Sequence, residues 1–148
     1  MERILVIDDD EAICNTISRA LRFEGYEVDV ANTGRQAIEC SERRFYNLAL
    51  IDMRLPDVEG TELLTALKTT TPKMVKIILT GNASLQNSIT AINRGVDGYL
   101  TKPVEMDVLL KTIKEHLTNQ STEKEFDQRK VAEFIETQLR KMDQTVTS

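Results

Sequence analysis

Five short apolar runs, separated by longer stretches with helical spacing, constrain the fold of this chain more than any other feature. The runs lie at residues 3–7, 27–30, 47–51, 75–79 and 98–101. A short continuous apolar run is typical of a strand that is covered on both faces, as strands in parallel sheets are. When such strands alternate with helices, the pattern indicates a doubly wound α/β fold with a parallel sheet.

The stretches between the runs carry apolar residues at helical spacing. A first stripe contains Ile13, Ile17 and Leu21 and ends before Gly25, and a second predicted helix begins with the order of a capping box at residues 33–36. The later stripes are Leu63, Leu64 and Leu67 before Pro72, then Leu85, Ile89 and Ile92 before Gly95, and finally Leu109, Ile113 and Leu117. We therefore expect five strands and five helices in one domain, residues 1–119.

Charge and apolar content narrow the functional class. The chain of 148 residues has a net charge of −5 and no basic block, which argues against direct nucleic-acid binding by this chain alone. It has no apolar run long enough to span a membrane and no signal-peptide pattern at its start, so a cytoplasmic protein without membrane contact is expected. A single histidine, His116, makes histidine-based metal sites and Ser-His-Asp chemistry unlikely starting points.

Polar and charged residues follow several of the predicted strands at the point where each strand ends. The first run is followed by residues 8–10, three consecutive aspartates, and the third by Asp52. Thr80 follows the fourth run, and Lys102 follows the fifth. Because the carboxyl ends of parallel strands meet at one edge of the sheet, we expect these side chains to converge there.

The chemistry of such a group favours phosphoryl transfer. Carboxylates held close together must be neutralised, or one of them must become protonated. A hard divalent cation such as Mg²⁺ neutralises them through oxygen ligands. Lysine and threonine are natural partners of phosphoryl oxygens, and a carboxylate can itself attack phosphorus to form an aspartyl phosphate. The pattern therefore predicts Mg²⁺-assisted phosphoryl transfer to an aspartate.

Taken in order, the motifs D-D, D-x-x-x-P-x-x-x-G, T-G and K-P resemble the receiver domain of two-component response regulators. The resemblance covers residues 1–119. It implies a flavodoxin-like fold, in which a five-stranded parallel sheet is flanked by five helices. It also implies that Asp52 accepts a phosphoryl group from a sensor histidine kinase or a phosphotransfer protein. Such a domain is a signalling module, not an enzyme that turns over an external substrate.

The resemblance further implies a Mg²⁺ site. Asp9 and Asp52 would supply direct carboxylate oxygens, and Asp8 would bind partly through water. Arg54 would contribute its backbone carbonyl. Two carboxylates are enough for such a site, so the third acid, Asp10, is interpreted as the N-cap of the first helix.

Other positions take roles from the same resemblance. Thr80 would hydrogen-bond the phosphoryl group, and Lys102 would pair first with Asp52 and then with the phosphoryl group. The bond from Lys102 to Pro103 would be cis, and Gly81 would leave room for the phosphate. Tyr99 would couple its rotamer to Thr80 in the switch, although simple core packing of Tyr99 stays a second interpretation.

A phosphatase of the haloacid-dehalogenase type is the competing hypothesis. That family also combines an aspartate nucleophile with a D-x-D pair, a threonine or serine, a lysine and Mg²⁺. Asp8 and Asp10 have the D-x-D spacing, but the following Glu11 and Ala12 depart from the usual pattern. The residue that acyl phosphates label, Asp52 or Asp8, distinguishes the two families.

The last part of the chain, residues 120–148, differs from the rest. A polar break at 119–122 precedes a predicted amphipathic helix with Val131, Ile135, Leu139 and Met142 on one side. This helix could pack back on the domain, pair with another copy of the chain, or continue into an output domain. A homodimer is therefore expected either through this helix or through the face of the fourth helix, fifth strand and fifth helix.

Overall fold

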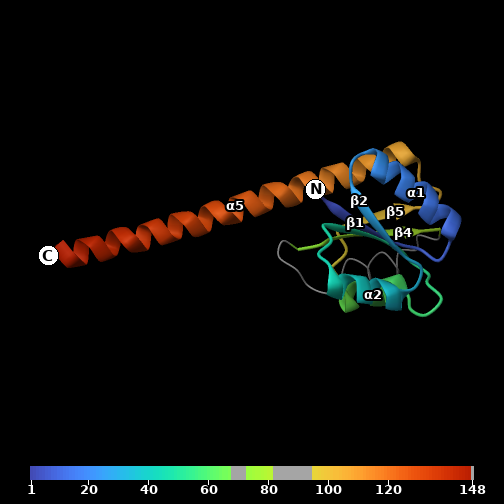
Figure 1. Cartoon of the computed structure of the whole chain (residues 1–148), viewed down its shortest axis with the longest axis horizontal. Helices are drawn as coiled ribbons and strands as arrows, with labels where there is room; N and C mark the ends of the chain where they lie inside the picture. The colour runs from blue at the N-terminus through green and yellow to red at the C-terminus, as the bar shows by residue number, and fades with distance from the viewer. Residues whose placement is uncertain (68–72, 82–94, 148) are drawn as a thin grey trace.

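The computed structural model describes residues 1–67, 73–81 and 95–147, with residues 68–72, 82–94 and 148 outside the described part. It contains a five-stranded parallel sheet with the strand order β2-β1-β3-β4-β5 (Figure 1). The strands are β1 (Arg3–Ile7), β2 (Glu27–Ala31), β3 (Leu48–Asp52), β4 (Val75–Thr80) and β5 (Gly98–Thr101). The predicted α/β fold is confirmed, and every predicted strand lies within one or two residues of its observed position.

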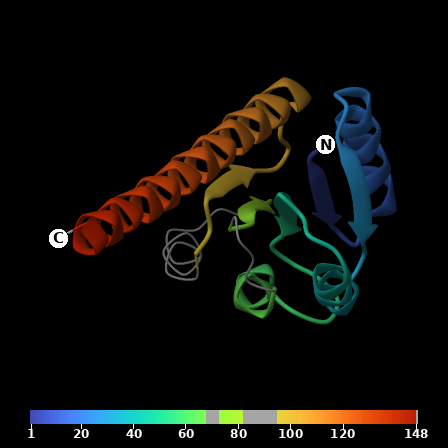
Figure 2. The ribbon, with the colours of Figure 1, turned by 60° about the vertical axis from the view of Figure 1, so that its left-hand side comes forward.

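Helices cover both faces of the sheet. They are α1 (Glu11–Phe23), α2 (Gly34–Arg43), α3 (Gly60–Ala66) and α5 (Met106–Thr147). Helices α1 and α5 lie on one face, and α2 and α3 lie on the other (Figures 1 and 2). The predicted helix with Leu85, Ile89 and Ile92 lies outside the described residues.

Burial on both faces explains why the strands are continuous apolar runs. In β1, Ile4 and Val6 pack into the core under α1 and α5, while Leu5 and Ile7 pack into the core over α2 and α3. All four side chains are almost completely buried. Because successive side chains of a strand point to opposite faces, neither face of β1 can be polar.

The helix starts follow from local side-chain chemistry. The Asp10 carboxylate accepts hydrogen bonds from the backbone N–H groups of Ala12 (2.9 Å) and Ile13 (3.1 Å), which confirms that Asp10 caps α1. Thr33 caps α2 by accepting a hydrogen bond from the backbone N–H of Gln36 at 3.1 Å. Both caps lie at the carboxyl edge of the sheet, so they fix the loops that carry the polar residues.

Helix α5 differs from the prediction. The sequence indicated a polar break at 119–122, but α5 is one helix of 42 residues, about 63 Å long at 1.5 Å per residue. Gln120 is buried rather than part of a linker. Its amide donates to the backbone carbonyls of Asn47 and Lys73, both at 2.9 Å, and accepts from the Asn47 side chain at 3.1 Å. The predicted break is wrong because these polar residues include no glycine or proline, and one of them docks the helix.

Beyond Gln120 the helix extends away from the domain (Figure 1). Five large apolar residues in the described part of its distal half are exposed: Val131, Phe134, Ile135, Leu139 and Met142. The helix therefore does not pack back on the sheet, which was one of its three predicted arrangements. In the part of the chain that the structure describes, no helix is long and apolar enough to cross a membrane.

Candidate functional site

Three aspartates converge at the carboxyl edge of the sheet. Strands β1 and β3 are parallel neighbours with Ile7 opposite Ile51, so Asp8 and Asp52 occupy the next positions on adjacent strands. One carboxylate oxygen each from Asp8, Asp9 and Asp52 lies within 4.8 Å of the others. Asp8 and Asp52 are 3% and 9% exposed, whereas Asp9 is exposed to solvent. The structure therefore brings these three residues together at the sheet edge where the sequence predicted them.

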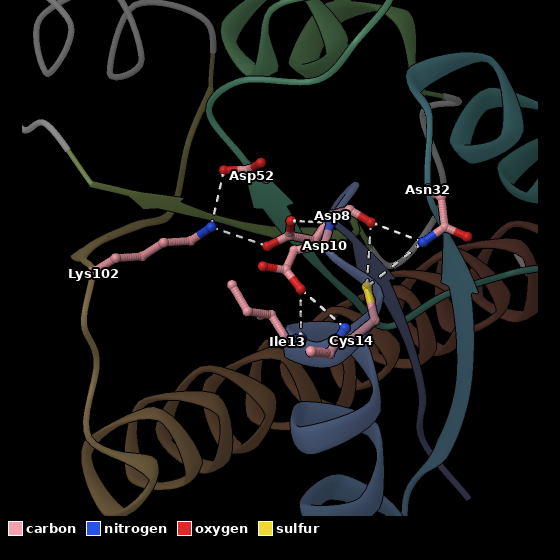
Figure 3. Close-up of polar contacts among 8 residues, drawn as sticks. Asp8, Asp10, Ile13, Cys14, Asn32, Asp52 and Lys102 are labelled. Carbon is pink, nitrogen blue, oxygen red and sulfur yellow. Dashed lines mark hydrogen bonds and ion pairs between the residues drawn. The ribbon is translucent and has the colours of Figure 1, made fainter.

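Lys102 bridges the two buried carboxylates. Its Nζ lies 3.0 Å from Asp8 Oδ2 and 3.2 Å from Asp52 Oδ1 (Figure 3). Burial lowers the pKa of a lysine, but the hydrogen bonds and negative charges of Asp8 and Asp52 outweigh it, so the pKa of Lys102 is raised. The Lys102-Pro103 peptide bond is cis, as the resemblance implied. Lys102 is therefore a permanent positive charge at the centre of the site.

The surroundings of the Asp52 carboxyl group oppose its ionisation. Burial and then the negative charge of Asp8 raise the pKa of Asp52 above its ordinary value. The charge and hydrogen bond of Lys102 and the backbone of Arg54 act in the opposite direction without cancelling the effect. One lysine does not neutralise three carboxylates, so a further cation beside them is electrostatically favoured.

The residues predicted at the ends of β4 and β5 reach the same edge. Thr80 ends β4, is 3% exposed and pairs with Thr101, and the backbone N–H of Lys102 donates to the Thr80 carbonyl at 2.6 Å. Tyr99 packs on the core over α2 and α3, and within the described residues its buried hydroxyl has no hydrogen-bond partner. Next to Thr80, a Cβ added to Gly81 would meet no described atom within 4 Å.

The loop from β3 to α3 is short, and backbone contacts join its two ends. Arg54 pairs with Glu59 in an isolated antiparallel bridge, and the backbone N–H of Gly60 donates to the Met53 carbonyl at 2.7 Å. A Cβ at Gly60 would lie 2.5 Å from the Asp52 carbonyl oxygen, so the helix can approach this strand end only with glycine there. The glycine of the D-x-x-x-P-x-x-x-G motif thus fixes the backbone directly after Asp52.

The sequence analysis missed two residues that hydrogen-bond to the backbone carbonyl of Asp8. Asn32 Nδ2 donates to the Asp8 carbonyl at 3.0 Å, and Cys14 Sγ donates to the same oxygen at 3.2 Å (Figure 3). Burial raises the pKa of the Cys14 thiol to about 11, which keeps it protonated as a donor. Asn32 follows β2 directly, so the rule that located the other site residues also applied to it.

Comparison with known proteins agrees with this geometry. The sequence model of the response regulator receiver domain matches residues 4–114. Transcriptional regulatory protein ZraR of Klebsiella oxytoca is 36% identical over 116 residues, which are 78% of this chain and 26% of ZraR. A receiver domain protein from Methanospirillum hungatei has a crystal structure with a TM-score of 0.80 and 48% identity, covering 83% of this chain and 98% of that one.

These matches define the class of protein. The chain belongs to the response regulator receiver domain family and is a receiver domain of two-component signal transduction. A second curated relative, the cell cycle response regulator CtrA of Brucella ovis, is 33% identical over 75% of this chain and 48% of its own length. The chain thus spans between a quarter and a half of these two longer relatives.

Proposed function

We propose that this receiver accepts a phosphoryl group on Asp52 from the phosphohistidine of a sensor kinase or phosphotransfer protein. The observation that carries the proposal is the Lys102 ammonium group, bound at once to the carboxylates of Asp8 and Asp52. An ammonium group held there can follow the negative charge from the carboxylate to an incoming phosphoryl group. The Asp52 carboxylate attacks phosphorus, the bond from phosphorus to the histidine nitrogen breaks, and that nitrogen keeps the electron pair.

Mg²⁺ is the proposed cofactor. The donor set suits it, because Asp8, Asp9 and Asp52 offer hard carboxylate oxygens at one point and the Arg54 backbone carbonyl lies two residues after Asp52. Bound there, the ion supplies positive charge that neutralises the carboxylates and the phosphoryl oxygens. Thr80 would hold a phosphoryl oxygen through a hydrogen bond donated by its hydroxyl, and Lys102 would hold another through an ion pair.

The same proposal includes a switch. The attached phosphoryl group carries about two negative charges on its oxygens, and these draw the Thr80 hydroxyl inward. Tyr99 follows Thr80 and alters the face that includes β5 and the start of α5; the fourth helix predicted for this face lies outside the described residues. The Tyr99 hydroxyl supports this role, because within the described residues it makes no hydrogen bond that a rotamer change of the ring would break. The module works in the cytoplasm, contacts neither membrane nor nucleic acid directly, and turns over no external substrate.

The phosphatase alternative is disfavoured by Asp10. In that reading Asp10 is the second acid of a D-x-D pair and works beside Asp8. Here its carboxylate instead accepts two backbone N–H groups at the start of α1, and it is not among the three clustered carboxylates.

Self-association through the distal part of α5 is a further part of the proposal. The exposed stripe that includes Val131, Ile135 and Leu139 lies on a straight helix, which is a shape complementary to a second copy of itself. A two-fold pair buries the same stripe on both chains, and isolated helices are marginal in water without such a partner.

The direct test is incubation with acetyl phosphate, with and without Mg²⁺, followed by intact mass measurement. The wild type is expected to gain one phosphoryl group only with Mg²⁺. Asp52→Ala is expected to gain none while it keeps its fold, and Asp107→Ala, which changes an exposed acid on α5, is expected to label normally. Retained labelling of Asp52→Ala would refute the assignment.

A further inference from the structure

The β2–α2 turn, defined here as residues 32–35, comprises the two residues after β2 and the first two residues of α2. It contacts both acidic loops of the site but offers no ligand itself. We propose that this turn is a positioning bracket, which holds the loop after β1 against the loop after β3 and so sets the affinity of the site for Mg²⁺. The inference rests on the proposed metal site and makes Asn32 and Asp57 positioning residues, which contact the backbone around the metal-binding loops and not the metal.

The first arm of the bracket is Asn32. Asp8 N donates to the Ala31 carbonyl at 3.1 Å, and Asn32 Nδ2 donates to the Asp8 carbonyl at 3.0 Å. The Asn32 side chain therefore continues the pairing of β1 with β2 one step beyond the last strand residue. With its backbone fixed on this side, Asp8 presents its carboxylate on the other side, toward Lys102 and Asp52 (Figure 3).

The second arm is Asp57, in the loop from β3 to α3. Asp57 Oδ1 accepts from the Gly34 N–H at 2.8 Å, and Oδ2 accepts from the Arg35 N–H at 3.0 Å. These two N–H groups begin α2, where they have no partner within the helix. Both hydrogen bonds lower the pKa of Asp57, so this exposed carboxylate stays ionised and keeps both acceptors.

Close packing makes this second arm rigid. A Cβ at Gly34 would lie only 2.0 Å from Val58 Cγ1, so the loop lies directly against the turn. The other end of the loop is closed by the hydrogen bond from Gly60 to Met53, next to Asp52. The loop is therefore clamped at both ends, and its position relative to Asp8 depends on the turn that Asn32 also belongs to.

The test is the dissociation constant of Mg²⁺, measured by calorimetric titration of the purified chain with magnesium chloride. Asn32→Ala and Asp57→Ala are each expected to weaken Mg²⁺ binding about tenfold, the range seen when contacts behind metal ligands are removed. Asp57→Asn, which keeps one accepting oxygen for Gly34, is expected to recover most of the affinity. The double variant is expected to lose less than the product of the single losses, because both arms act through one turn.

Asn47→Ala is the matched control. Asn47 makes equivalent contacts at the opposite edge of the sheet, where its Oδ1 accepts from the Arg3 N–H at 2.9 Å. It is expected to lower the melting temperature while the Mg²⁺ dissociation constant stays within about twofold of wild type. Unchanged Mg²⁺ affinity in Asn32→Ala and Asp57→Ala, or an equal loss in Asn47→Ala, would overturn the bracket. A wild type that binds no Mg²⁺ would contradict the metal site as well as the bracket.

Discussion

At the residue scale, the ionised carboxylate of Asp52 is held in the fold at a cost in stability. Burial and the charge of Asp8 raise its pKa in the folded state. A carboxyl whose pKa is higher in the folded than in the unfolded state destabilises the fold once it ionises. The penalty is absent below the unfolded pKa of about 3.9, where both states are protonated, and it is complete above the folded pKa.

Replacing Asp52 should therefore stabilise the protein at neutral pH. Asp52→Asn is expected to raise the free energy of unfolding by on the order of 1 kcal/mol near neutral pH, and the gain should fade as the pH falls toward the unfolded pKa. Urea denaturation at both ends of this range measures the effect. Glu115→Gln, the same kind of acid-to-amide change at an exposed position of α5, is the matched control. A destabilised Asp52→Asn at neutral pH would show that ionised Asp52 supports the fold instead.

Two glycines near the site give a second residue-scale prediction. A Cβ at Gly60 would lie 2.9 Å from the Met53 Cα, whereas one at Gly81 meets no described atom within 4 Å. Gly60→Ala is expected to destabilise the fold by about 2 kcal/mol, because backbone cannot move aside as a side-chain tip can. Gly81→Ala should leave the free energy of unfolding nearly unchanged. Equal effects in thermal melts of both variants would contradict this account of the loop.

At the scale of elements, α5 is docked by a polar residue within its length. Gln120→Ala removes two hydrogen bonds to the carbonyls of Asn47 and Lys73 and is expected to lower the free energy of unfolding by about 1–3 kcal/mol. Gln128→Ala is the same change on the same helix at an exposed position and should have almost no effect. Urea denaturation of the two variants distinguishes the loss of docking contacts from a change in helix propensity. Equal losses in the free energy of unfolding would rule out a docking role for Gln120.

The difference between local signals and distant partners explains which features could be predicted from the sequence. The strands and the cluster of Asp8, Asp9 and Asp52 were predictable because apolar runs and strand ends are local signals. The break near Gln120 was predicted wrongly because its partner Asn47 is 73 residues away, and local polarity alone resembles a linker. Asp57 was missed for a related reason, since its partners begin a helix 22 and 23 residues earlier in the chain.

At the scale of the whole molecule, the distal half of α5 is a long exposed arm beside a well-packed domain (Figure 1). If the arm pairs with a second copy, sedimentation of the wild type should show a concentration-dependent dimer. Leu139→Glu places a charge in the apolar stripe and is expected to give a monomer. Thr137→Glu introduces the same residue at a different exposed position, where the Thr137 hydroxyl donates to the Glu133 carbonyl of the same helix, and this variant should still dimerise. A wild type that stays monomeric at all concentrations would exclude this surface.

The proposed function requires that the phosphoryl group is attached to Asp52. Borohydride converts an aspartyl phosphate to homoserine, so peptide mapping after labelling with acetyl phosphate and Mg²⁺ identifies the acceptor residue. The account predicts homoserine at position 52 and at no other aspartate. Homoserine at position 8, or an unmodified peptide around Asp52 in a chain that has gained a phosphoryl group, would contradict it.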